Sequence, residues 1–260
     1  MISSTSNQHI RMLRELLTRP HARKKSGSFV AEGVRMVSET PPDMIEEIYI
    51  SESFAGSAQD LGEPVSALIR GAELVDDKVF RSVSDTVNPQ GIMAVVRQKS
   101  CSVRQILELP DPLILFLENI QDPGNLGTMI RTAEGAGATG IIMSRDTADV
   151  YNPKVVRSTM GSLYRMPFAY ADDLCEAVAQ ARDGGTDVYA AYLSGSVCYT
   201  EADYTKGCAF LIGNEGSGLT AEAARAATAC VRIPMAGKLE SLNAAAAASI
   251  LLYEAARQRM

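Results

Sequence analysis

The sequence has few of the residues that bind metal ions or activate nucleophiles. It contains only two histidines, both near the N-terminus, and its five cysteines are scattered without a CxxC pair. Zinc sites use His and Cys at short spacings, so we expect no metal site and reduced, mostly buried thiols. A hydrolase with a histidine-activated nucleophile is also disfavoured, because His9 and His21 lie outside the half of the chain that is expected to form the main sheet.

Long apolar runs are absent as well. No uninterrupted run approaches the roughly 18 residues that a membrane-spanning helix needs. The first 17 residues, MISSTSNQHIRMLRELL, become charged early and have no apolar core of the kind found in secretory signals. We therefore expect a cytoplasmic protein without a membrane partner.

Charge is distributed unevenly along the chain. The net charge is −6 at pH 7, but residues 1–35 contain seven Lys/Arg against two Glu, which gives +5 there and leaves −11 for the remainder. A basic segment on an acidic body suits contact with nucleic-acid phosphates. On charge alone, a solvated helix face explains the pattern equally well.

The first 105 residues mix helical and strand-like patterns. The apolar spacing in residues 7–19 predicts a helix, and residues 45–51 and 91–98 are typical of short strands. Residues 100–112 resemble a connector bounded by prolines. We expect residues 1–105 to form a smaller α/β domain.

The remainder, residues 106–260, alternates strands and helices. Strands are expected at 113–120, 140–144, 163–171, 187–193, 208–213 and 230–235. Helices are expected at 125–138, 152–162, 172–184, 220–227 and 241–259. Pro167 places its strand at an edge or a bulge. The alternation predicts an α/β domain with a mainly parallel sheet and helices on both faces.

A glycine-rich loop, GNEGSGL at residues 213–219, follows one of these predicted strands. Open parallel sheets bind ligands beyond the carboxyl ends of their strands, so the loop is well placed. The phosphate-binding patterns G-x-G-x-x-G and G-x-x-x-x-G-K-[ST] are absent, and Glu215 would repel a phosphate. The loop better suits a ligand with hydroxyls, amides or positive charge, and a tight turn without any ligand is the alternative.

Polar residues follow two other predicted strands. Asn125 opens a helix and Arg131 lies one to two turns along it, while Ser241 and Asn243 follow the strand at 230–235. Each of these can be a helix cap or a surface residue. The three strand-end loops are nevertheless expected to converge at one edge of the sheet, where they could position an anion.

In this order, the three segments resemble the motifs of the SpoU, or TrmH-like, RNA ribose methyltransferases. The matching patterns are N-x-G-x-x-x-R-T-A at 125–133, G-N-E-G-x-G-L at 213–219 and I-P-M-x-G…S-L-N at 233–243. Each pattern is weak alone, but the ordered set is highly specific. Residues 28–39 and 89–96 resemble, more loosely, the N-terminal RNA-binding module of larger family members.

The resemblance implies a SPOUT-like fold with a C-terminal trefoil knot that binds S-adenosylmethionine at the sheet edge. It implies a homodimer that transfers the methyl group to a ribose 2′-hydroxyl of RNA. The added N-terminal module is more similar to the rRNA-modifying branches than to the minimal tRNA enzymes. We therefore expect 23S rRNA as the substrate, with tRNA as the alternative.

The resemblance also assigns roles to residues. Arg131 is expected to bind the adjacent RNA phosphate and to orient or acidify the 2′-hydroxyl, because arginine stays protonated and is a poor base. Asn125 would hold the substrate or a loop, and Ser241 and Asn243 would shape the pocket near the methyl group. The residues expected at the cofactor are Leu211, Gly213, Asn214, Gly218, Ile233, Met235 and Leu242.

Three positions stay open. Alanines from Ala244 onward replace a valine-serine-valine-like run found in many members, so a hydroxyl near Ala245 is missing and any catalytic role for it is in doubt. Glu215 is either structural or forms hydrogen bonds across the knot or a dimer interface. Arg157 either touches RNA or packs structurally.

Two other functions compete with methyl transfer. One is an RNA-binding protein that keeps this fold without catalysis, which failure to bind S-adenosylmethionine would favour. The other is an unrelated dinucleotide-dependent α/β enzyme, which the absent glycine fingerprint disfavours.

Overall fold

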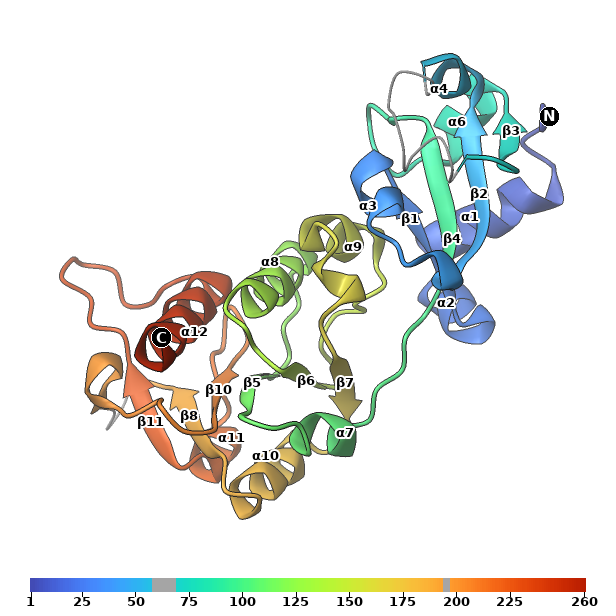
Figure 1. Ribbon diagram of the computed structural model, residues 1–260. Helices are drawn as coiled ribbons and strands as arrows, with labels where there is room; N and C mark the ends of the chain where they lie inside the picture. The colour runs from blue at the N-terminus through green and yellow to red at the C-terminus, as the bar shows by residue number, and fades with distance from the viewer. Residues whose placement is uncertain (58–68, 194–196) are drawn as a thin grey trace. The chain divides into compact units, whose positions relative to one another are not determined.

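A computed structural model describes residues 1–57, 69–193 and 197–260 (Figure 1). The chain divides into two compact units. The first unit comprises Met1–Lys99 and Asp149–Tyr164, and the second comprises Ser100–Ala148 and Arg165–Met260. The first unit thus includes a segment that the sequence places between two strands of the second.

The first unit contains a four-stranded sheet in the order β1-β4-β2-β3. Strand β4 is antiparallel to β1 and β2, while β2 and β3 are parallel. The strands are β1 (Ser28–Glu32), β2 (Ile45–Ser51), β3 (Glu73–Val75) and β4 (Ile92–Arg97). The helices are α1 (Gln8–Thr18), α2 (Pro20–Ser26), α3 (Val34–Ser38), η1 (Pro42–Met44), α4 (Glu52–Ser57), α6 (Asp77–Val83), α9 (Pro153–Thr159) and η3 (Ser162–Tyr164).

Side chains alternate across this sheet and bury both of its faces. On one face, Val30 and Tyr49 belong to an apolar cluster with residues of α1 and α6. On the other face, the ring of Phe29 lies 4.7 Å from that of Tyr151 and 6.5 Å from that of Tyr164. The segment Asp149–Tyr164 therefore supplies part of the core of the first unit.

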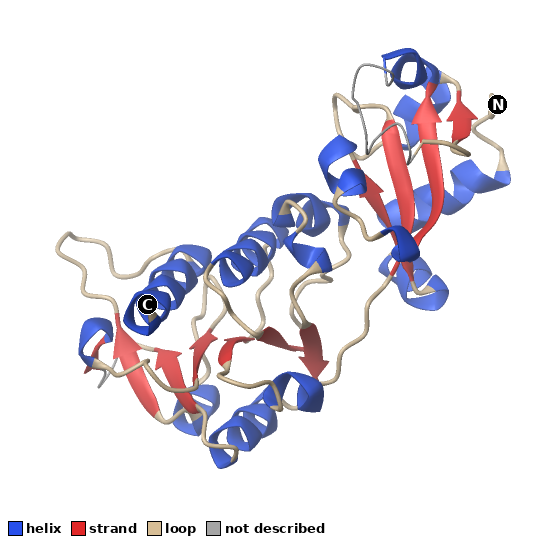
Figure 2. Ribbon diagram, in the orientation of Figure 1, coloured by secondary structure: helices blue, strands red, loops and turns tan. Residues whose placement is uncertain are grey.

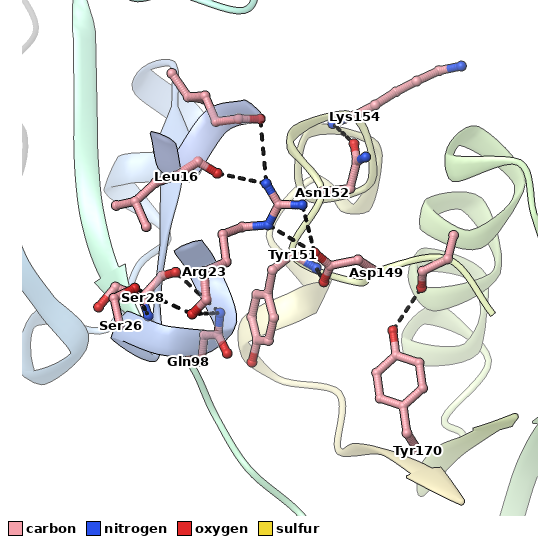
Figure 3. Close-up of polar contacts among 12 residues, drawn as sticks. Leu16, Arg23, Ser26, Ser28, Gln98, Asp149, Tyr151, Asn152, Lys154 and Tyr170 are labelled. Carbon is pink, nitrogen blue, oxygen red and sulfur yellow. Dashed lines mark hydrogen bonds and ion pairs between the residues drawn. The ribbon is translucent and has the colours of Figure 1, made fainter. Parts of the chain in front are cut away.

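A buried arginine ties this segment to the two N-terminal helices (Figure 3). The Arg23 side chain is 2% exposed, and its Nε and Nη2 donate to Oδ2 of Asp149 at 2.9 and 2.7 Å. Its Nη1 donates to the Leu16 carbonyl at 2.7 Å, at the end of α1. Gln98 donates in turn to the carbonyls of Arg23 and Ser28 at 3.1 and 3.2 Å. One guanidinium thus joins α1, α2 and the segment that precedes α9.

The second unit contains a seven-stranded parallel sheet in the order β7-β6-β5-β10-β8-β11-β9. The strands are β5 (Leu113–Leu117), β6 (Gly140–Ser144), β7 (Phe168–Ala171), β8 (Asp187–Ala191), β9 (Val197–Cys198), β10 (Cys208–Ile212) and β11 (Ala229–Arg232). The helices are α7 (Val103–Leu107), α8 (Pro123–Gly135), α10 (Leu174–Asp183), η4 (Tyr199–Glu201), α11 (Ala221–Ala226) and α12 (Ala244–Arg259).

Helices cover both faces of this sheet, as the sequence predicted (Figure 2). Helices α8 and α12 pack together on one face, and α7, α10 and α11 pack on the other. The central strand β10 is buried along its whole length, which matches its unbroken apolar sequence. The prediction of a parallel α/β sheet is confirmed.

Four local expectations need correction. The helix expected to open at Asn125 begins at Pro123, and Asp122 is its N-cap, accepting from the Asn125 N–H. The strand expected at 230–235 ends at Arg232, because Pro234 has no N–H to continue a ladder. The strand expected at 163–171 begins only at Phe168, after Pro167, and it lies at the predicted edge. The connector at 100–112 contains α7, which begins with a capping box between Ser102 and Gln105.

Within the described ranges, no helix is long and apolar enough to cross a membrane.

Replacing Arg23 with methionine is expected to destabilise the first unit by roughly 3 kcal/mol, because the Leu16 carbonyl and Asp149 lose a buried partner. Urea unfolding followed by circular dichroism measures the change. The matched control is Arg19→Gln, which removes an exposed arginine 3.5 Å from Glu15 and is expected to cost less than about 0.5 kcal/mol. Equal effects of the two substitutions would contradict a structural role for Arg23.

Candidate active site

A cavity of about 420 Å³ lies at the carboxyl ends of three neighbouring strands of the second unit. Its walls come from the ends of β8, β10 and β11, from the loops that follow β10 and β11, and from α12. Its size suits a small organic ligand, and its place agrees with the general position of ligand sites in open α/β sheets. We call residues 118–125 the first loop, 213–220 the second loop and 233–243 the third loop.

Gly213 lets the second loop fold back onto itself. Asn214 and Gly218 exchange two backbone hydrogen bonds of 3.1 and 2.9 Å, which close a tight turn. A Cβ atom on Gly213 would overlap the backbone atoms of Gly218 and Leu219. Glycine is therefore required here by backbone packing, and the turn presents main-chain groups to the cavity.

Hydrogen bonds from both ends of the second loop fasten it to the first loop. At one end, the Asn214 side chain donates to the Asn119 carbonyl at 2.7 Å, where Asn119 has a left-handed φ of 53°. At the other end, the Glu118 carboxylate accepts from the backbone N–H and the hydroxyl of Thr220 at 2.8 and 2.7 Å. Both contacts join segments about 100 residues apart in sequence.

Glu215 makes the central connection between these loops. Its carboxylate accepts from the backbone N–H groups of Gln121 and Asp122 at 3.2 and 3.1 Å, and from Nδ2 of Asn125 at 3.0 Å. Both N–H groups lie just before the N-terminus of α8, where a negative charge is favoured. Partial burial alone would raise the pKa of Glu215, but the donated hydrogen bonds outweigh it and hold the pKa below its usual value. The residue left open by the sequence thus joins two loops of the same chain.

Asn125 extends this network to the third loop. Its Oδ1 accepts from Nδ2 of Asn243 at 3.0 Å. Oδ1 of Asn243 caps α12 by accepting from the N–H groups of Ala245 and Ala246 at 2.9 and 3.2 Å. One chain of hydrogen bonds, from Glu215 through Asn125 to Asn243, therefore connects all three loops.

The structure brings most of the predicted residues together at the cavity. The predicted residues that line it are Gly213, Asn214, Gly218, Ile233, Met235, Ser241 and Leu242. Leu211 does not line it, because its side chain is fully buried in the core cluster that includes residues of α10 and α11. Asn125 and Asn243 lie outside the lining and hold the loops, as just described.

The two arginines singled out from the sequence differ in their surroundings. Arg131 is exposed on α8 and does not line the cavity, and its side chain makes no hydrogen bond or ion pair within residues 1–57, 69–193 and 197–260. Arg157 belongs to the first unit, where its Nη2 lies 2.8 Å from Oδ2 of Asp85. Arg157 is therefore held by an ion pair within the first unit, and the Arg131 side chain remains available to a ligand.

Sequence reasoning missed the contribution of β8. Ala191, Tyr192 and Leu193, at the end of this strand, form one wall of the cavity. The strand itself was predicted, and its place beside β10 follows from the sheet order, which the sequence does not reveal. Apolar residues at a strand end carry no chemical signal that would mark them as site residues.

The lining shows what the cavity can do chemically. Among the described residues that form it there is no His, Cys or Lys. The lining combines glycines and apolar side chains with polar or charged groups, a mixture that suits the binding of a small polar ligand. The polar and charged residues are Tyr192, Asn214, Glu215, Ser217, Arg232, Glu240 and Ser241.

Substituting Gly213 with alanine is expected to destabilise the second unit by roughly 2–3 kcal/mol, because backbone atoms must move to admit the new Cβ. Gly216→Ala, in the same loop, is the matched control, since its Cβ would meet only Oδ1 of Asn214 at an ordinary 3.5 Å. Chemical unfolding of both variants measures the difference. A Gly213 variant as stable as the Gly216 variant would show that the close packing is not required.

Two family models together match most of the chain. A model described as the SpoU rRNA Methylase family matches residues 112–253, and one described as an MRM3-like substrate binding domain matches residues 7–94. The chain is 32% identical over 257 residues to 23S rRNA (guanosine(2553)-2'-O)-methyltransferase RlmP of Bacillus subtilis, with 97% of each chain covered. It is 30% identical over 268 residues to 23S rRNA (uridine(2479)-2'-O)-methyltransferase of Streptomyces viridochromogenes, covering 99% of this chain and 92% of the relative.

Solved structures agree with these matches. The AdoMet-bound rRNA methyltransferase from Sinorhizobium meliloti is similar with a TM-score of 0.86 and 35% identity, covering 100% of this chain and 98% of that one. The SpoU methyltransferase AviRb from Streptomyces viridochromogenes, in complex with the cofactor AdoMet, has a TM-score of 0.83 and 30% identity, covering 97% and 98%.

Proposed function

The chain belongs to the SpoU rRNA methylase family, and we propose on that premise that it methylates a ribose 2′-hydroxyl of 23S rRNA with S-adenosylmethionine as the methyl donor. The observation that carries the proposal is the cavity of the second unit, whose rim is formed by the second and third loops and braced by the first. Relatives named for 23S rRNA 2′-O-methylation span nearly the whole chain, which supports rRNA over tRNA.

The residues present fit S-adenosylmethionine. This cofactor is an amino-acid nucleoside with a sulfonium and no phosphate, so it needs no phosphate-binding lysine. The turn at Gly213 allows the main chain to approach the ligand closely, and Ile233, Met235 and Leu242 give apolar contacts. We propose that these residues, with Asn214 and Gly218, hold the cofactor.

The protein's own contribution is positioning and electrostatics. When bound, S-adenosylmethionine supplies an electrophilic methyl group on its sulfonium sulfur. Arg131 would bind the RNA phosphate beside the target and orient the 2′-hydroxyl, which its permanent charge also makes easier to deprotonate. Ser241 would contact the substrate from the cavity wall, while Asn125 and Asn243 keep the loops in place.

We also propose the finer features that the family resemblance implied: a trefoil knot in the second unit and a cytoplasmic homodimer. The close fastening of the second loop to the first, and the packing of α12 on α8 and β10, support the knot. Arg131 is exposed and does not line the cavity of its own chain. This supports a dimer in which Arg131 of one chain would complete the substrate surface at the cavity of the other. Residues 1–105 would bind RNA and residues 106–260 would carry the reaction.

Labelled S-adenosylmethionine tests the proposed reaction. The chain is incubated with separate pools of unmodified 23S rRNA and tRNA, and the products are digested to nucleosides and separated. We expect label on a 2′-O-methyl nucleoside from rRNA. Label from tRNA alone would overturn the substrate, and absence of label together with absence of cofactor binding would favour a non-catalytic RNA-binding protein.

Arg131→Ala is expected to lower kcat by about 100-fold while leaving the Kd for S-adenosylmethionine unchanged, because it removes a charged contact to the substrate and not to the cofactor. Turnover is measured with the labelled cofactor, and binding by calorimetry. Near-normal turnover would show that Arg131 is not catalytic.

Mixing the Arg131→Ala chain with a Gly213→Ala chain, whose displaced second loop is expected to prevent cofactor binding, tests whether Arg131 serves the partner's cavity. A hybrid dimer of Arg131→Ala and Gly213→Ala chains combines one intact cavity with one intact arginine from the other chain. Recovery of activity to about a quarter of the wild-type level is expected for random assortment in a twofold dimer. Absence of recovery would assign Arg131 to the cavity of its own chain.

A further inference from the structure

We propose that the exposed faces of α1 and α2 form a docking surface for the phosphate backbone of paired RNA. The proposal rests on the function just given and identifies the surface through which the first unit would bind the RNA substrate. The surface, here called the basic face, consists of Arg11, Arg14, Arg19, Lys24 and Lys25.

The structure separates the seven cations of residues 1–35 into two groups. Arg23 is buried and committed to Asp149, and Arg35 lies 3.7 Å from Glu39. The five cations of the basic face are all exposed. Within the described parts of the chain, their only ion pair is the 3.5 Å contact of Arg19 with Glu15, which is weak in water. The basic face therefore retains most of its positive charge.

The amphipathic packing of α1 fixes this charge in place. Ile10, Leu13, Leu16 and Leu17 are buried against the sheet of the first unit, which turns Arg11 and Arg14 toward solvent. Helix α2 is held by the hydrogen bonds of Arg23 to the end of α1 (Figure 3). The cations thus stand on a rigid support and lose little further backbone freedom when they bind.

The side chains around these cations indicate phosphate contacts and not base contacts. Helices α1 and α2 contain no Phe, Tyr or Trp, and His21 is the one exposed aromatic ring on them, so the basic face offers a single small ring and no extended platform on which unpaired bases could stack. None of the large apolar side chains exposed in the described residues lies on α1 or α2, which disfavours insertion into a lipid surface. Exposed cations that have neither an aromatic platform nor large apolar side chains beside them are suited to bind a continuous phosphate backbone.

The charge of the rest of the chain limits how such a polyanion can approach. Residues 1–35 carry +5, while the remainder carries −11. An RNA is therefore repelled by most of the acidic body and attracted to the basic face, which orients the encounter. This contact is expected to depend steeply on salt, because binding releases counterions from the RNA.

The double variant Arg11→Gln/Arg14→Gln tests the basic face in the full chain. For a paired rRNA fragment, we expect Kd and KM to rise roughly ten-fold and the slope of log K against log salt to fall by about 2. The Kd for S-adenosylmethionine and kcat at saturating RNA are expected to stay unchanged. The matched control is Lys206→Gln/Arg225→Gln, which removes the same charge from exposed positions of the second unit and is expected to leave the salt slope unchanged.

Four outcomes would overturn the proposal. If the slope of log K against log salt is unchanged in the Arg11/Arg14 variant and methyl transfer is normal, the basic face does not bind RNA, and the proposed function is unaffected. An equal loss in the control variant would show a general charge effect. A larger loss for a single-stranded oligonucleotide than for the duplex would contradict paired RNA as the ligand. Failure of the wild-type chain to methylate or bind any RNA would instead overturn the proposed function together with this inference.

Discussion

The hydrogen bonds of the Glu215 carboxylate are the interaction on which the candidate site depends. They join the glycine-rich loop after β10 to the start of α8. Asn125, which donates to Glu215, also accepts a hydrogen bond from Asn243 at the start of α12. Three segments distant in sequence are thereby held in one arrangement. Partial burial would raise the pKa of Glu215, but these donated hydrogen bonds favour the charged carboxylate and lower the pKa, so the connection is retained at pH values below the usual range of a glutamate.

A second constraint acts in the first unit, where the buried Arg23 joins three segments of the chain. Arg23 lies in α2 and donates a hydrogen bond to the Leu16 carbonyl near the end of α1. It also forms an ion pair with Asp149, in a segment that the sequence places between β6 and β7 of the second unit. The same short basic stretch thus contains one structural cation and five that face solvent. The first unit is completed by chain from the other half, and residues 1–99 are not expected to form its full core alone.

Much of this architecture is encoded locally and could be predicted. The parallel sheet followed from apolar strands alternating with helical patterns, and Asn243 caps a helix as its position suggested. The sheet order, the wall formed by Tyr192, and the packing of residues 149–164 depend on contacts between distant segments, which leave no local pattern. The side chain of Leu211, which the sequence predicted at the cavity, lies in the core cluster because β10 is buried along its whole length.

The central claim is that the cavity lined by the second and third loops binds S-adenosylmethionine. Hydrogen exchange of backbone amides, with and without this cofactor, tests it. The account predicts slower exchange on cofactor binding in residues 212–219 and 231–243, with the first unit unaffected. Binding that slows exchange elsewhere and leaves these two segments unchanged would contradict it.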